Sequence, residues 1–373
     1  MEVTVISPKE HLTYIHSRSS VSFLQTPAWG QVKQDWQSIS IGWFQDGDLV
    51  GAGLMLLRKV PKLDRYFAYL PEGPDLPWDD EVTVRAALQA LVQFAKARNV
   101  FQIKIGPHVW SRRWDANTIK DAIAQGGVAR ISDLPADQVS RTGQSVSQIL
   151  RNLGWQQPAA GDESFGDYQP RYVFQLDIAD KTVDEIFQGF NQLWRRNIRK
   201  AHKSGVRIDV GDEHALKEFH DCYVETAKRD HFTPRPLSYF ENMYQAMRAE
   251  DPHRLQLFLA HHDEHEGAIA ATTMTQVGNH AWYSYGASTT AARDLRPSNA
   301  IQWHMIQEAI NSGCHTYDLR GISNSLNPDN HLFGLIQFKL GTGGYVQEYV
   351  GEWNFNVSPL LAKAFNFYMA RRG

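Results

Sequence analysis

The segment Phe338-Lys339-Leu340-Gly341-Thr342-Gly343-Gly344 combines a lysine with three glycines in four residues. Glycine tolerates positive φ and lets the backbone approach a ligand closely. Backbone N–H groups in such a turn can bind a developing oxyanion, and the ammonium of Lys339 adds positive charge where negative charge builds up. The alternative is a glycine-rich turn between two strands with a solvated lysine, and local chemistry alone favours it. The residue order excludes a phosphate-binding loop of the form GxxxxGK[ST].

A dense basic run lies in the middle of the chain. On a helix, Arg195, Arg196, Arg199, Lys200 and Lys203 cluster over one broad face, where they could contact a phosphate backbone. A helix C-terminus also favours cations, so a solvated basic end explains the run equally well.

Two pairs of residues have the spacing of a binding site. Arg235 and Tyr239 stand four residues apart across the start of a predicted helix, which suits phosphate binding; a surface ion pair of the arginine is the alternative. Tyr283 and Tyr285 lie two residues apart in a predicted strand, which predicts that they share a face. Two phenols on one face suit a polar ligand, although such a stripe is more often core.

Metal and cofactor motifs are weak. The stretch His261-His262-Asp263-Glu264-His265 lies between two predicted strands, where a polar hairpin loop is expected, and it lacks the HExxH spacing. Cys222 and Cys314 stand alone, which predicts free thiols in a reducing compartment. GxSxG and a post-strand GxGxxG are absent. The sequence therefore predicts neither a metal nor a cofactor.

Composition describes an ordinary globular protein. At 373 residues the chain is longer than one core usually supports, so two domains are expected. The formal net charge of −3 provides no global field for nucleic acid, so any RNA contact must rest on a local patch. With no signal peptide and no apolar run long enough to cross a bilayer, a soluble cytoplasmic protein is expected.

Alternating strand-like and helix-like segments predict a mixed α+β or α/β fold. An Asp-Gly turn at residues 46–47 indicates a hairpin. A capping-box spacing, Thr182 and Glu185, opens a helix predicted to run to Ser204. Residues 156–170, rich in Gly, Pro, Asp and Gln, predict a loop. Other expected strands are 38–43, 49–58, 67–70, 100–105, 172–178, 206–210, 255–260, 268–276, 280–285, 316–319 and 345–355. Other expected helices are 81–98, 119–124, 146–153, 215–229, 237–248, 299–312 and 359–371.

Taken in order, several motifs resemble the FemABX family of peptidoglycan peptidyltransferases, of the smaller, FemX-like type. The C-terminal matches include Tyr317-Asp318-Leu319-Arg320-Gly321-Ile322 and the Lys339 segment. The matching stretches are 23–33, 69–74, 196–206, 283–288, 299–303, 317–322 and 334–344. The resemblance covers residues 23 to 355, with a poor match between 107 and 170.

The resemblance implies two domains built like GCN5-related acyltransferases (GNAT) around a substrate cleft. Residues 1–170 would form the precursor-binding domain, completed by 346–373, and 171–345 the acyl-donor side. It implies transfer of an aminoacyl group from aminoacyl-tRNA to the stem peptide of a peptidoglycan precursor, either UDP-MurNAc-pentapeptide or lipid II. Peripheral membrane association is compatible with the lipid-linked form.

The resemblance also implies roles for individual residues. Lys33 and Arg235 match cations that bind the precursor's diphosphate, Tyr239 and Tyr285 match its polar partners, and Lys339 matches a lysine near the reacting carbonyl. Phe338 and Tyr283 are expected to complete the substrate site. The basic run, Arg195, Arg196, Arg199 and Lys200, would contact tRNA.

The sequence departs from the family pattern in two places. Gly106-Pro107 stands where the family often has Asp-Pro, so an acidic contact is lost or moved, and no long heptad pattern predicts the helical arm of some members.

Two rival functions remain. One is a CoA-dependent GNAT acyltransferase that acts on a small amine or amino acid, although its pyrophosphate loop is absent. A non-catalytic protein that binds tRNA or precursor is the other.

Overall fold

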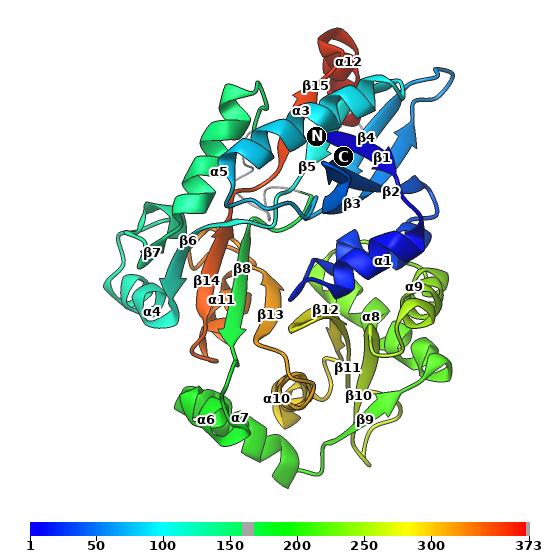
Figure 1. The fold of residues 1–373 in the computed structure, drawn as a ribbon. Helices are drawn as coiled ribbons and strands as arrows, with labels where there is room; N and C mark the ends of the chain where they lie inside the picture. Colours follow the sequence, from blue (N-terminus) through cyan, green and yellow to red (C-terminus); the bar gives the residue numbers. More distant parts are fainter. Residues whose placement is uncertain (159–167, 371–373) are drawn as a thin grey trace. The chain divides into compact units, whose positions relative to one another are not determined.

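The computed structural model describes residues 1–158 and 168–370, so most of the predicted loop 156–170 and the predicted end of the last helix at Arg371 lie outside the described residues. The chain forms two compact units. The first contains residues 1–113, 135–172 and 347–373, and the second contains 114–134 and 173–346. Figure 1 follows the chain through both units.

The first unit is built on a sheet in the order β1-β2-β3-β4-β5-β15. The predicted hairpin is confirmed between β2 and β3, where Asp46 and Gly47 both have positive φ, as a tight two-residue turn requires. The strands are β1 (Glu2–Val5), β2 (Gln37–Gln45), β3 (Asp48–Lys59), β4 (Tyr66–Leu70), β5 (Val100–Ile105) and β15 (Trp353–Asn356).

Helix α3 (Glu81–Lys96) carries the clearest helical pattern of the first unit. Asp80 caps it by accepting hydrogen bonds from the N–H groups of Val82 and Thr83. Its predicted apolar stripe, Val84 to Ala95, is buried in the core of this unit. The remaining elements are α1 (Pro8–His16), α2 (Pro27–Val32), β6 (Trp110–Asp115), β7 (Gln138–Val139), α5 (Arg141–Asn152) and α12 (Pro359–Ala370).

The second unit contains a sheet in the order β14-β8-β13-β12-β11-β10-β9. Its strands are β8 (Tyr172–Asp177), β9 (Arg207–Gly211), β10 (Leu255–His261), β11 (Ala270–Val277), β12 (His280–Ser288), β13 (Thr316–Gly321) and β14 (Tyr345–Tyr349). Its helices are α4 (Ala116–Gln125), α6 (Val183–Gly189), α7 (Gln192–Lys203), α8 (Leu216–Asp230), α9 (Leu237–Glu250), α10 (Pro297–Asn311) and α11 (Phe333–Leu340). The mixed α/β class is confirmed.

The single helix predicted from Thr182 to Ser204 is wrong, because the segment forms two helices. The capping box at Thr182 and Glu185 is present and opens α6. Helix α6 ends at Gly189, the backbone of Phe190 is extended, and Asn191 is the N-cap of α7. Phe190 is buried among aromatic rings, so packing of this side chain outweighs continuation of the helix.

Two further differences concern the C-terminal part. Helix α11 was not expected, because only a turn was predicted around Lys339. The predicted strand 345–355 is two strands, β14 and β15, separated at Gly351, whose φ is +77°. Helices α8 and α9 have 15 and 14 residues, and the described chain contains no long helical arm between them. None of the described helices combines the length and the apolar content that crossing a membrane requires.

Candidate active site

Arg235, Tyr239 and Tyr285 form one cluster in the second unit. Arg235 lies two residues before α9, Tyr239 lies in its first turn, and Tyr285 lies on β12. The guanidinium carbon of Arg235 is 4.5 Å from the centre of the Tyr239 ring, and the hydroxyls of Tyr239 and Tyr285 are 3.0 Å apart. Although burial works against it, the two phenols raise the pKa of Arg235. The cluster offers an exposed cation backed by two hydroxyls, which suits a phosphate.

Tyr283 does not share a face with Tyr285, so that prediction is wrong. Tyr285 pairs with Thr273 on β11 while Tyr283 pairs with Met274, which leaves Ser284 as the extra residue of a β-bulge. Consecutive residues of β11 face opposite sides, and so do the two tyrosines. Burial raises the pKa of Tyr283 to about 12, and the side chain is half-buried.

Lys339 lies in the last turn of α11 and is buried, with 3% of its surface exposed. Its Nζ donates hydrogen bonds to the carbonyl oxygens of Gly321 at 2.7 Å and Arg320 at 3.2 Å. Burial lowers the pKa of Lys339 to about 7, although the nearby Asp318 carboxylate works against this. Lys339 therefore loses its charge at a much lower pH than a solvated lysine does.

The carbonyls that hold Lys339 lie on a distorted end of β13. Arg320 has a φ of +64°, and the pairing of β13 with β8 shifts between Asp318 and Gly321. The buried Asp318 supports this conformation, because it accepts the Arg320 N–H at 2.5 Å and the Gln175 amide at 2.9 Å. Non-glycine residues held at positive φ concentrate at functional sites.

The glycines after Lys339 have packing roles. The N–H groups of Gly341, Thr342 and Gly343 each bond a carbonyl three residues earlier, so they do not form the oxyanion-binding turn suggested by the sequence. A Cβ on Gly341 would lie 2.1 Å from the Trp194 indole, and the Trp194 Nε1 donates to the Phe338 carbonyl at 2.7 Å. Phe338 itself packs against the same indole ring.

Helix α7 presents its basic residues outward. Trp194, Ile198 and Ala201 form its buried face. On the other side, an open hollow of about 470 Å³ is lined by Gln192, Arg195, Arg196 and Arg199. Arg195 donates to the Gln188 side chain at 2.7 Å. Over the described ranges, Arg195, Arg196, Arg199 and Lys200 form no ion pair with a carboxylate.

Lys33 belongs to the first unit, where it caps the end of α2. Its Nζ lies 4.9 Å from the centre of the Trp29 ring, which fixes the cation against an aromatic face.

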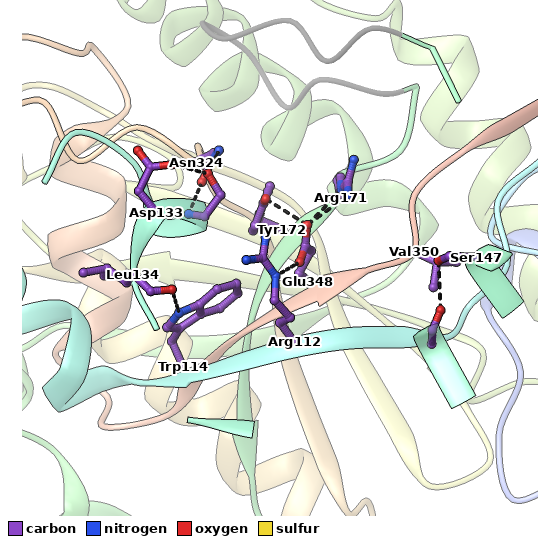
Figure 2. Close-up of polar contacts among 12 residues, drawn as sticks. Arg112, Trp114, Asp133, Leu134, Ser147, Arg171, Tyr172, Asn324, Glu348 and Val350 are labelled. Atoms are coloured by element: carbon purple, nitrogen blue, oxygen red, sulfur yellow. Dashed lines mark hydrogen bonds and ion pairs between the residues drawn. The ribbon is translucent and has the colours of Figure 1, made fainter. Parts of the chain in front are cut away.

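Sequence reasoning missed a buried glutamate in the first unit. Figure 2 shows Arg112, Arg171 and Tyr172 converging on Glu348. The Arg112 Nε lies 2.6 Å from the carboxylate, the Arg171 Nη2 3.0 Å and the Tyr172 hydroxyl 2.9 Å. Charge-assisted bonds of this kind hold Glu348 to Arg112 and Arg171 within this unit. No local pattern in the sequence identifies it, because Glu348 and its partners come from three distant segments.

A second missed group surrounds Gly106, where the family resemblance lacked its acidic residue. A small pocket of the first unit is lined by Glu72, Gly106, His108, Arg171 and Glu352, together with Pro107, Gln169, Pro170, Tyr349 and Gly351. Glu352 accepts a hydrogen bond from the Tyr69 hydroxyl and lies 3.4 Å from the Lys104 ammonium. Carboxylates that come from elsewhere in the chain therefore line the pocket beside Gly106.

In the histidine-rich stretch 261–265, His261 contacts carboxylates of the protein itself. His261 ends β10 and bridges two carboxylates, with Asp209 at 2.7 Å and Glu218 at 2.9 Å. Within the described residues, no group of three or more His, Cys, Asp and Glu side chains is arranged to hold a metal ion. Both cysteines are buried free thiols.

The fold resembles that of tandem proteins of the GCN5-related (GNAT) type. A tandem GNAT protein from the clavulanic acid biosynthesis pathway has a TM-score of 0.54, at 11% identity over 96% of this chain and 99% of that one. The crystal structure of FemX has a TM-score of 0.80, at 24% identity over 98% and 99%. The predicted GNAT-like fold is confirmed.

The chain belongs to the FemAB family, whose profile matches residues 6–257 and 249–369. A lipid II:glycine glycyltransferase of Staphylococcus aureus (strain MRSA252) is 25% identical over 98% of this chain and 97% of the relative. The predicted FemABX membership and the prediction of an aminoacyltransferase are confirmed.

Proposed function

We propose that the protein transfers an aminoacyl group from aminoacyl-tRNA to the side-chain amine of the stem peptide of a peptidoglycan precursor, building an interpeptide bridge. The observation that carries the proposal is the grouping of Arg235, Tyr239 and Tyr285 in a chain of the FemAB family. The S. aureus relative, named as acting on lipid II, supports this class of acceptor.

The acceptor's diphosphate would bind at the Arg235 cluster. A guanidinium forms charge-assisted hydrogen bonds with phosphate oxygens, and the hydroxyls of Tyr239 and Tyr285 can donate to the same group. In the first unit, Lys33 at the end of α2 is separately proposed as a cation that binds precursor phosphate. Phe338 and Tyr283 are proposed to shape the site through packing. Phe338 packs on the Trp194 ring, and the β-bulge of β12 places Tyr283 on the opposite face of the sheet from Tyr285.

The reaction is aminolysis of an ester. The acceptor nitrogen attacks the ester carbonyl carbon, a C–N bond forms, the C–O bond to the tRNA ribose breaks, and the ribose oxygen takes up the amine's proton. Because a lysine-type amine has an unperturbed pKa of about 10.4, it is an ammonium at neutral pH and must lose one proton to solvent before it can attack. The proton that the ribose oxygen takes up is a second one, which the nitrogen releases as the C–N bond forms. Lys339 is proposed to stabilise the tetrahedral oxyanion. Two of its three N–H groups bond carbonyls in the described structure, which leaves the third for the substrate oxygen.

The acyl donor would contact the outer face of α7. Arg195, Arg196 and Arg199 border an open hollow, and Lys200 continues the same exposed surface. Cations without carboxylate partners can release counterions from a phosphate backbone on binding, which favours this face for tRNA.

One incubation tests the proposal. Purified protein receives a mixture of charged tRNAs with UDP-MurNAc-pentapeptide or with lipid II, and mass spectrometry follows the precursor. The expected product is heavier by one amino acid and requires charged tRNA. Release of free CoA thiol from acetyl-CoA, without tRNA, would favour the GNAT rival. Precursor binding without transfer from any charged tRNA would favour the non-catalytic rival. Either result overturns the proposal.

A further inference from the structure

Three segments of the first unit concentrate positive charge in a chain whose formal net charge is −3. The hairpin from Arg58 to Arg65, which joins β3 to β4, carries four cations and one carboxylate, Asp64. The end of α3 adds Lys96 and Arg98. Residues 359–373 contain Lys363, Arg371 and Arg372 and no acidic residue.

The hairpin, the end of α3 and α12 lie at the same end of this unit (Figure 1). Val60 of the hairpin and Leu361 and Phe365 of α12 pack on one aromatic cluster. Asn99, just after α3, donates to the Asp64 carboxylate at 3.0 Å. The cations of these segments that the structure describes therefore belong to one surface: Arg58, Lys59, Lys62, Arg65, Lys96, Arg98 and Lys363.

The same surface exposes large apolar side chains. Leu360 is 86% exposed, Phe367 60% and Leu63 47%. Leu360 and Phe367 stand seven residues apart on α12, on the outer face that also carries Lys363, whereas Ala362 is buried toward the sheet. Exposed apolar residues gathered among cations mark an interaction site more often than a solvated surface. We call this set of exposed apolar residues and cations the basic–apolar surface.

We propose that the basic–apolar surface docks on an anionic phospholipid bilayer and, resting on the proposed function, that the acceptor is the lipid-linked precursor. Apolar side chains on a cationic helix enter the boundary between headgroups and acyl chains, while Lys and Arg reach the lipid phosphates. Each cation near an anionic membrane surface strengthens binding by about fivefold.

The combination of positive charge and exposed apolar side chains favours an anionic bilayer over other partners of the basic–apolar surface. A second copy of this chain would bring two cationic surfaces together, which opposes association. A purely polar ligand such as RNA would leave Leu360 and Phe367 without an apolar partner. An anionic bilayer satisfies both components, because it provides phosphates at its surface and hydrocarbon directly below.

Vesicle sedimentation tests the inference without any enzymatic assay. The full chain is mixed with phosphatidylcholine vesicles or with vesicles that also contain phosphatidylglycerol. Binding is expected only to the anionic vesicles. Lys59→Gln with Lys62→Gln and Arg65→Gln should weaken binding by about a hundredfold, at about fivefold per cation. Leu360→Ser with Phe367→Ser should weaken it at least tenfold.

Matched controls keep the result interpretable. Lys9→Gln with Lys217→Gln and Lys228→Gln removes the same charge from exposed positions elsewhere, and Val210→Ser removes an exposed apolar residue from β9. Both should bind like the unaltered chain. Equal binding to neutral vesicles, or equal effects of control and surface variants, would overturn the inference, as would a dimer that the Leu360 and Phe367 changes dissociate.

A second measurement separates this inference from the proposed function. The surface variants should retain transfer to UDP-MurNAc-pentapeptide and lose transfer to lipid II presented in anionic vesicles. Transfer without vesicle binding would refute the docking surface alone. Vesicle binding without transfer to any precursor would refute the proposed reaction alone.

Discussion

At the scale of single residues, the proposed chemistry depends on the buried ammonium of Lys339. We expect Lys339→Met to lower kcat by a factor of about 10² to 10³, because one oxyanion contact is removed. The Kd for the precursor should stay unchanged, since its diphosphate is assigned to the Arg235 cluster. Kinetics and calorimetry on the same preparation check both values. Near-normal turnover would show that Lys339 has only the structural role of joining α11 to β13.

Asp318 partly opposes the effect of burial on the pKa of Lys339, which gives a prediction about pH. Lys339 acts in its protonated form whereas the acceptor amine must be deprotonated, so the rise of kcat with pH should level off as pH passes the Lys339 pKa of about 7. Asp318 favours the ammonium, and Asp318→Asn should therefore lower that pKa and move this levelling-off to lower pH. The loss should be larger at pH 8 than at pH 6.

A control for this profile exists on the neighbouring strand. Asp177 of β8 is exposed and pairs with Lys181, so Asp177→Asn should leave the pH profile unchanged. If Asp318→Asn instead lowers kcat equally at every pH, Asp318 supports only the fold of the β13 end.

Some residues of the site could be predicted from the sequence, and others could not. Arg235 and Tyr239 follow from helical spacing, which is local, and the structure brings them together with Tyr285. The face of Tyr283 was predicted wrongly, because strand alternation assumes no bulge. The positive φ of Arg320 and the burial of Asp318 are invisible in the sequence, since they arise from pairing between distant strands.

At the scale of elements, α7 is the part assigned to tRNA. Arg196→Gln with Arg199→Gln should reduce the slope of log Kobs against log salt by about 1.4 for a largely single-stranded contact. Titration of charged tRNA at several salt concentrations measures this slope, and precursor binding should not change. Gln substitution of Lys217, which pairs with Asp221 on α8, is the control. An unaltered slope in the α7 variant would place tRNA elsewhere.

The junction of α7 and α11 gives a stability prediction. Gly341→Ala should lower the free energy of unfolding by about 1–3 kcal/mol, because the new Cβ would overlap the Trp194 indole. Gly334→Ala in the same helix meets nothing within 4 Å, and it should be neutral or stabilise by up to about 1 kcal/mol. Urea unfolding compares the two. Equal effects would mean that Trp194 moves aside without cost.

Local patterns identified most elements but not every boundary. Capping and turn residues gave the start of α6 and the β2–β3 hairpin. Helix α11 was missed because its residues, Phe333–Leu340, are mostly apolar, and short apolar runs do not distinguish helix from other buried structure. The break at Phe190 depends on the aromatic cluster that buries it, which no local pattern contains.

At the scale of the whole molecule, the first unit depends on β15. Trp353 is 1% exposed and lies in the core of this unit, so Trp353→Ala should cost about 3–5 kcal/mol. Hydrogen exchange should show the loss in β3 to β5 and much less in β10 to β12. Trp353→Phe should retain most of the protection. Uniform loss of protection across both units would mean that they unfold together.

Non-local pairing also limited what the sequence revealed at this scale. The motif order was enough to recognise the family and the mixed α/β class, because it depends on residue types in sequence. The assignment of residues 114–134 to the second unit depends on contacts with segments about two hundred residues away, such as Ala116 N–H to the Gly344 carbonyl at 2.9 Å. Such contacts leave no periodicity to detect.

The pairing of β15 with β5 also has a consequence for synthesis on the ribosome. Residues 173–346 emerge after most of the first unit and before its last strand. The first unit therefore cannot complete its sheet during synthesis, and the β5 edge stays unpaired while the second unit is translated. An unpaired apolar edge invites aggregation. Cotranslational chaperones, or a slow refolding step from denaturant, are expected to matter more for this unit than for the second.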